Sequence, residues 1–114
     1  MSGDLIYKIC TAEEWAEAEK AGRYRGSALD VTDGFIHFST AEQARETARR
    51  HFAGQTGLVL VSVDPDALSE PLTWEPSRGG DLFPHLYAPL DVAAVTAVHP
   101  LPVGDNGTHE FSAM

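Results

Sequence analysis

The chain alternates short apolar runs with polar segments, and several of these runs have the length and composition of β-strands. Residues 5–10 are rich in β-forming residues and predict a strand. Residues 57–63 form the strongest strand candidate, and their continuous apolar character indicates a central position in a sheet. Residues 92–98 alternate between two faces and predict another strand. Residues 35–38 and 72–75 are shorter strand candidates.

Two helices are predicted from residues that cap helix ends. Thr11 is followed three residues later by Glu, which is the spacing of a capping box, and Gly22 ends the helix that begins there. Trp15 lies on the apolar face of this helix and should anchor it to the core. Ser39 is also followed three residues later by Glu and predicts a second helix, which Gly54 closes.

The order of these elements is strand, helix, strand, helix, and then mostly strand. This order favours an α+β fold over a doubly wound parallel fold. The 114 residues fit one domain, for which we expect the boundaries 1–103. Residues 104–114 are small and polar and predict a mobile C-terminal tail. Residues 23–27 read as a loop, and residues 76–90 are rich in Gly and Pro and predict mostly irregular structure.

The composition of the chain indicates which classes of binding partner are disfavoured. The formal net charge of −9 disfavours binding to nucleic acid or to an anionic membrane. No apolar run approaches the roughly 18 residues of a membrane span, and the N-terminus lacks the basic region of a signal peptide. Cys10 is the only cysteine, so we expect a buried, inert thiol. These features predict a cytoplasmic protein, either a monomer or a weak homodimer.

The first candidate site lies at residues 34–40, where a predicted strand meets a predicted helix. The first N–H groups of a helix are a ready anion site. His37 beside this junction would bind a ribose hydroxyl or phosphate, or act as a base, with Ser39 and Thr40 as ligand-binding neighbours. The alternatives are that His37 is a buried histidine bonded to backbone and that Ser39 only caps the helix.

The second candidate site is the long connection at residues 74–87. It combines charged and aromatic side chains, a mixture that is typical of functional loops. Arg78 would hold a phosphate, Glu75 would orient a hydroxyl, and His85 would bind the ligand or transfer a proton. Tyr87 is a further candidate ligand-binding residue. In the structural alternative, the aromatic residues close one end of the core and Glu75 pairs with Arg78.

Sequence motifs exclude several common chemistries. The chain has no P-loop, dinucleotide-binding glycine motif, nucleophile elbow or C-x-x-C. A metal site built from His37, His85 and a carboxylate would lack the tight spacing of common zinc sites. We therefore expect no metal, although a metal-assisted enzyme stays as a third hypothesis.

Residues 34–43 (GFIHFSTAEQ) and residues 74–90 resemble a bacterial family known as domain of unknown function 952. The resemblance extends to residues 6–9 and to Trp15, Tyr24 and Ser27, and covers about residues 5–103. This family has been grouped at a distance with the ADP-ribosyltransferase superfamily. The resemblance therefore implies a small split β-sheet, here with two N-terminal helices, that binds NAD in a cleft.

The same resemblance suggests roles for individual residues. His37 matches the superfamily's histidine on an early strand, which contacts the ribose or nicotinamide side of NAD. Phe38 stands where the superfamily often has Gly, which is a departure from the pattern. Glu75 is the candidate for a late glutamate that binds the ribose hydroxyl, and His85 for a second histidine.

The leading functional hypothesis is an enzyme that transfers ADP-ribose from NAD to a small molecule or a protein. The alternative is a non-catalytic module that binds a small nucleotide ligand in the same cleft. The acidic composition argues against an RNA substrate.

Overall fold

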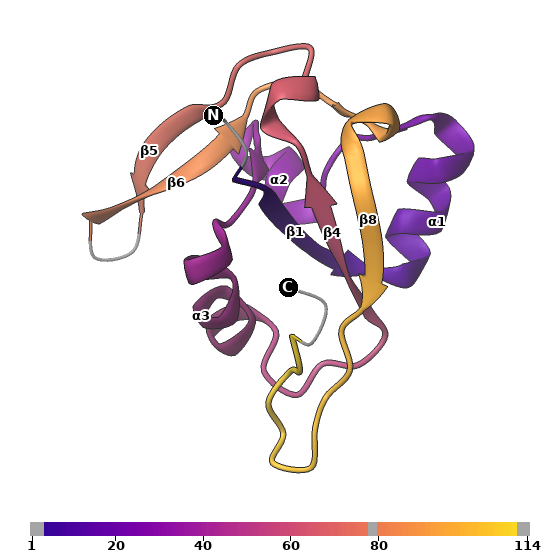
Figure 1. Cartoon of the computed structure of the whole chain (residues 1–114), viewed down its shortest axis with the longest axis vertical. Helices are drawn as coiled ribbons and strands as arrows, with labels where there is room; N and C mark the ends of the chain where they lie inside the picture. Colours follow the sequence, from indigo (N-terminus) through magenta and orange to yellow (C-terminus); the bar gives the residue numbers. More distant parts are fainter. Residues whose placement is uncertain (1–3, 78–79, 112–114) are drawn as a thin grey trace.

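The main sheet has three antiparallel strands in the order β1–β4–β8 (Figure 1). The computed structural model describes residues 4–77 and 80–111. Strands β1 (Ile6–Thr11) and β8 (Val95–Pro100) both pair with β4 (Leu58–Val63). This confirms the central strand that the sequence predicts, because nearly all side chains of β4 are buried.

A second sheet has the order β3–β6–β5 and is also antiparallel. It consists of β3 (Ile36–His37), β6 (Asp81–Leu86) and β5 (Thr73–Ser77). Strands β5 and β6 form a hairpin that extends away from the main sheet (Figure 1). A short third pair joins β2 (Arg23–Tyr24) to β7 (Leu90–Asp91).

Three α-helices accompany the sheets, which confirms the α+β class. They are α1 (Ala12–Ala21), α2 (Ala28–Asp33) and α3 (Ala41–His51). Among the described residues, the 3₁₀ helices η1 (Pro65–Ala67) and η3 (Val92–Ala94) lie in the connections. None of the helices within the described residues is long and apolar enough to cross a membrane.

Each α-helix begins with a capping box, in which two residues three apart exchange side-chain-to-backbone hydrogen bonds. The pairs are Thr11 with Glu14, Ser27 with Asp30 and Thr40 with Gln43. The prediction for α1 is confirmed, including its end at Gly22 and the burial of Trp15. The predicted cap at Ser39 is wrong by one residue. The expectation of two helices is also wrong, because α2 forms as well.

Two segments that the sequence predicted as irregular contain strands. Residues 81–86 form β6, the central strand of the second sheet, although Gly and Pro are frequent around them. Residues 23–24 form β2 inside the predicted loop. The predicted strand at residues 92–98 begins instead with the 3₁₀ helix η3, and its strand runs over residues 95–100.

The chain passes from the second sheet to the main sheet just after β3. The Phe38 N–H donates to the Pro84 carbonyl at 3.0 Å, on the β6 side. The next residue, Ser39, exchanges backbone hydrogen bonds of 2.8 and 2.9 Å with Tyr7 on β1. Both sheets therefore lie next to His37.

The segment after Val103 is exposed at residues 105–108 and returns to the domain at its end. Phe111 is buried in a cluster with Leu58, Leu60 and Leu101. The guanidinium of Arg45 lies 5.2 Å from the centre of its ring. The packed region thus extends beyond the expected boundary at Val103, and the end of the predicted tail, residues 112–114, lies outside the described residues.

Candidate functional site

The pairing of β3 with β6 brings the two histidine candidates together. His37 and His85 are directly opposite one another in the register, so their side chains project from the same face of the sheet. Their ring centres are 5.3 Å apart. Parts of the two segments that the sequence marks as separate candidate sites therefore lie side by side.

Glu75, on β5, holds His85 from the neighbouring strand. Its Oε1 lies 2.6 Å from His85 Nδ1 and accepts a second hydrogen bond of 2.8 Å from the Tyr87 hydroxyl. The hydrogen bonds from His85 and Tyr87 lower the pKa of Glu75, and the bond to Glu75 raises the pKa of Tyr87. Glu75 thus remains ionised and fixes the orientation of both partners.

Phe35 packs against both imidazoles. Its ring stacks on His85 with centres 4.1 Å apart and also lies 4.5 Å from His37 and 5.0 Å from Tyr87. From the sequence alone, Phe35 is predicted only as part of a strand. Its alternation with His37 along the chain was the signal that both side chains share a face.

His37 is held by carboxylates on both ring nitrogens. Its Nδ1 lies 2.5 Å from Asp30 Oδ1, and its Nε2 lies 3.0 Å from Asp33 Oδ2. Asp30 also accepts the His37 backbone N–H at 3.2 Å. The alternative in which the ring nitrogens of His37 bond to backbone groups therefore does not describe this site.

Asp30 is a buried carboxylate that joins His37 to Lys8. Only 2 % of Asp30 is exposed, and its Oδ2 lies 2.7 Å from Lys8 Nζ. Burial alone would raise the pKa of Asp30, but the hydrogen bond from His37 and the charge of Lys8 outweigh it and keep the pKa below the ordinary value. Lys8 Nζ also donates to the His37 carbonyl at 3.0 Å.

Sequence reasoning missed both members of this ion pair, although each had a signal. Lys8 is a charged residue in a short, otherwise β-forming run, and such a residue is almost never buried without a partner. Asp30 stands three residues after Ser27, the same capping-box spacing that predicted the other helices.

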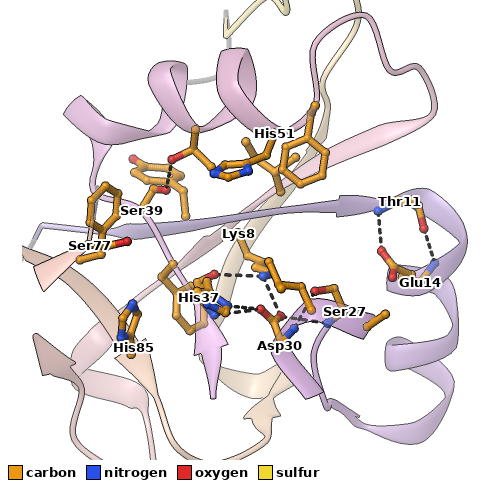
Figure 2. Close-up of a pocket in the computed structure, with 18 of the residues that line it drawn as sticks. Lys8, Thr11, Glu14, Ser27, Asp30, His37, Ser39, His51, Ser77 and His85 are labelled. Carbon is orange, nitrogen blue, oxygen red and sulfur yellow. Dashed lines mark hydrogen bonds and ion pairs between the residues drawn. The ribbon is translucent and has the colours of Figure 1, made fainter. Parts of the chain in front are cut away.

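These residues border a cavity of about 570 Å³ between β1, α2, α3 and the second sheet (Figure 2). His37, His85 and Ser39 line it, as do Lys8 and Asp30. Ser39 is buried and its hydroxyl lies 2.8 Å from that of Thr47 on α3. The volume is in the range of small-ligand sites.

The other predicted ligand-binding residues lie elsewhere. Thr40 caps α3 and lines a separate cavity of about 490 Å³ with Glu42 and Glu46. Tyr87 is about half exposed and does not line the cavity, although it contacts Glu75 and Phe35. Arg78, and therefore its pairing with Glu75, lies outside the described residues.

Comparison with protein families gives a match over residues 9–98 to the model described as protein of unknown function (DUF952). The chain belongs to the DUF952 family. A crystal structure of protein CC0527 from Caulobacter crescentus is 50 % identical in sequence, with 96 % of each chain covered and a TM-score of 0.89. A solution NMR structure of CC0527 is also 50 % identical, covers 96 % of this chain and 94 % of that one, and has a TM-score of 0.84. No curated protein matches the chain.

The match confirms the family resemblance that the sequence motifs indicated, and the family is described as one of unknown function. Over the described residues, no group of three or more His, Cys, Asp or Glu side chains is placed to hold a metal ion.

Proposed function

We propose that this DUF952 protein is an enzyme of the ADP-ribosyl-transfer type that binds NAD or a related nucleotide in the cavity beside His37 and His85. The observation that carries the proposal is the state of His85. Its Nδ1 is bound by Glu75, its ring lines the cavity, and Nε2 has no hydrogen-bond partner among the described residues. A general acid–base histidine has this arrangement: a carboxylate binds one ring nitrogen, and the other ring nitrogen is left for the substrate.

This arrangement suits the transfer of a ribosyl group. The bond between ribose C1′ and the nicotinamide nitrogen breaks, and nicotinamide leaves as a neutral molecule. The acceptor's lone pair forms the new bond to C1′, and its proton passes to His85 Nε2. Glu75 acts through His85, because its charge orients the ring and stabilises the imidazolium that forms.

His37 would bind the ribose. Its Nε2 contact is to Asp33, whose side chain is 38 % exposed, so a ligand hydroxyl can replace that carboxylate. The contact on Nδ1 is to Asp30, which is buried and fixed by Lys8. His37 therefore keeps one permanent partner and exchanges the other.

The first test is a two-dimensional NMR titration with NAD, ADP-ribose and nicotinamide. We expect shifts at residues 35–40 and 83–87. Nicotinamide release would then be measured for wild type, His85→Gln and the matched control His99→Gln, which alters an exposed histidine on β8. The proposal is supported if His85→Gln still binds the ligand but no longer releases nicotinamide, while His99→Gln behaves like the wild type. The absence of any NMR shift with millimolar ligand refutes it.

A non-catalytic binding module is the second candidate, and one observation favours it. Both ring nitrogens of His37 already contact carboxylates, so that residue is placed to hold its position rather than to transfer a proton. This function predicts saturable binding of the same nucleotides, without release of nicotinamide over long incubation and with no difference between His85→Gln and wild type in product formation.

A further inference from the structure

We infer that Tyr87 is a positioning residue for His85, because its hydroxyl holds Glu75 where the carboxylate keeps the His85 proton on Nδ1. The part of this inference that concerns catalysis rests on the proposed function, in which His85 Nε2 receives a proton. The location of the His85 proton is a property of the ligand-free protein, so it can be measured without any substrate.

Glu75 reaches His85 from an exposed part of the second sheet. Its strand, β5, lies at the edge of that sheet, and the Glu75 side chain is 36 % exposed. In the register Thr73 is opposite His85, so Glu75 contacts His85 diagonally, from the next residue on the same face. A partly exposed glutamate gains rotamer entropy when it turns into the solvent. A second contact that restricts the carboxylate therefore strengthens its bond of 2.6 Å to His85.

The Tyr87 hydroxyl provides this second contact. It donates to Glu75 Oε1 at 2.8 Å, and this is the same oxygen that lies next to His85 Nδ1. Tyr87 follows directly after the last residue of β6, and its ring centre lies 5.0 Å from that of Phe35, which also stacks on His85. Because Phe35 packs against the Tyr87 ring, the hydroxyl has a fixed support from which to hold the carboxylate.

The contact with Glu75 determines which nitrogen of a neutral His85 carries the proton. An ionised carboxylate accepts hydrogen bonds and donates none, so Nδ1 must be the N–H of the ring. The lone pair then lies on Nε2, which is the nitrogen that acts as the base in the proposed function. Neutral histidine in water favours the opposite tautomer, with its proton on Nε2. A weaker contact with Glu75 therefore leaves fewer molecules with a basic Nε2.

The neighbouring histidine does not compete for Glu75. His37 contacts carboxylates of its own, with Asp30 at 2.5 Å from Nδ1 and Asp33 at 3.0 Å from Nε2. Its ring centre is 5.3 Å from that of His85. Among the described residues, the carboxylate in contact with His85 is that of Glu75, so the tautomer of His85 reports on the position of Glu75.

The test is a long-range proton–nitrogen NMR spectrum of the histidine side chains of the full chain, recorded at a pH at which each imidazole carries one proton. Nitrogen chemical shifts distinguish a protonated ring nitrogen from one with a lone pair. In the wild type we expect the Nδ1–H tautomer of His85. Tyr87→Phe keeps the ring on Phe35 and should lower the ratio of the Nδ1–H to the Nε2–H tautomer severalfold. Tyr24→Phe removes the same hydroxyl from a ring that packs on Trp15, and should leave the ratio unchanged.

A double variant shows whether Tyr87 acts through Glu75. Glu75→Ala should lower the tautomer ratio at least as much as Tyr87→Phe does, and adding Tyr87→Phe to Glu75→Ala should lower it no further. The inference is overturned if Tyr87→Phe has the same effect in both backgrounds or leaves the ratio at the wild-type value. It is also overturned if the wild-type His85 carries its proton on Nε2.

Nicotinamide release by the wild type and Tyr87→Phe separates the inference from the proposed function. We expect a lower kcat and an unchanged KM in the variant, because Tyr87 does not line the cavity. If the tautomer ratio changes as expected but neither protein releases nicotinamide, the positioning of His85 stands and the proposed function is refuted. If both proteins release nicotinamide at the same rate, the role of Tyr87 in catalysis is wrong and the proposed function stands.

Discussion

Replacing Asp30 with Asn removes a negative charge that contacts two basic side chains. Asp30 contacts Lys8 Nζ at 2.7 Å and His37 Nδ1 at 2.5 Å, and its side chain is only 1 % exposed. Asn has the same shape and still offers one oxygen to the Ser27 N–H, so the capping box survives. The substitution removes the charge, and it also turns the amide NH₂ toward the His37 backbone N–H, whose hydrogen bond Asp30 Oδ1 accepts in the wild type.

The magnitude follows from the burial of Lys8. The Lys8 side chain is 8 % exposed, so its ammonium cannot recover hydration when Asp30 is neutralised. Removing one partner of a buried ion pair costs about 3–5 kcal/mol, because the other charge stays buried without compensation. A domain of this size has a total stability of about 5–15 kcal/mol. The variant should remain folded in water, with a much smaller free energy of unfolding than the wild type.

Urea unfolding followed by tryptophan fluorescence and circular dichroism would measure this loss. The midpoint should fall while the slope with urea is unchanged. Adding Lys8→Met should recover part of the loss, giving a coupling energy of about 1–3 kcal/mol in a double-mutant cycle. The exposed pair Glu17 and Lys20 should show almost no coupling. A cost below about 1 kcal/mol for Asp30→Asn, with no coupling to Lys8, would refute the reasoning, since it falls well short of the buried-pair range.

The same charge makes stability depend on pH in the acid range. The pKa of Asp30 is lower in the folded protein than its ordinary value near 3.9. Its contribution to stability is therefore fully present above the unfolded pKa and is lost as the pH falls toward the folded one. Between about pH 5 and pH 2 the wild type should lose more stability than Asp30→Asn. Equal acid sensitivity of the two proteins would contradict this.

Three further predictions test other parts of the fold. Gly26→Ala should destabilise the protein more than Gly22→Ala. Both residues have positive φ, but only at Gly26 would the new Cβ lie 2.6 Å from Asp30 Cβ. Equal urea midpoints for the two variants would contradict this. Burial, and secondarily the charge of Glu14, raises the pKa of Cys10 to about 12, so the thiol should react with a disulfide reagent at pH 8 only after unfolding. Phe111→Ala should lower the free energy of unfolding in urea by about 3 kcal/mol, because the Phe111 ring is buried in a cluster with Leu101. An unchanged free energy of unfolding would show that the C-terminal segment does not contribute to the core.

The elements that sequence predicted well are those whose signals are local. A capping box and a following glycine define α1 within a few residues of each other, and a continuous apolar run identifies β4 because burial on both faces selects such residues. The candidate histidines were also found locally, each from its own segment. What sequence alone did not provide is the strand register that places His37 opposite His85, since pairing between strands about fifty residues apart leaves no local trace.

The errors have physical causes as well. Ser39 and Thr40 both fit a capping box, with Glu42 and Gln43 respectively, and the spacing rule alone cannot choose between them. The structure selects Thr40, and Ser39 is used instead in backbone pairing with Tyr7 on β1. Asp30 was missed because α2 is only six residues long and gives almost no helical periodicity.

Pro84 explains why the protein has two sheets rather than one. In an antiparallel ladder, residues of a hydrogen-bonded pair exchange two backbone bonds. Phe38 donates to the Pro84 carbonyl, but a proline has no N–H to return, so the ladder between β3 and β6 breaks one residue after His37. The backbone at Ser39 then pairs with Tyr7 instead. A single missing donor thus sets the point at which the two sheets diverge, beside the cavity that His37 and His85 line.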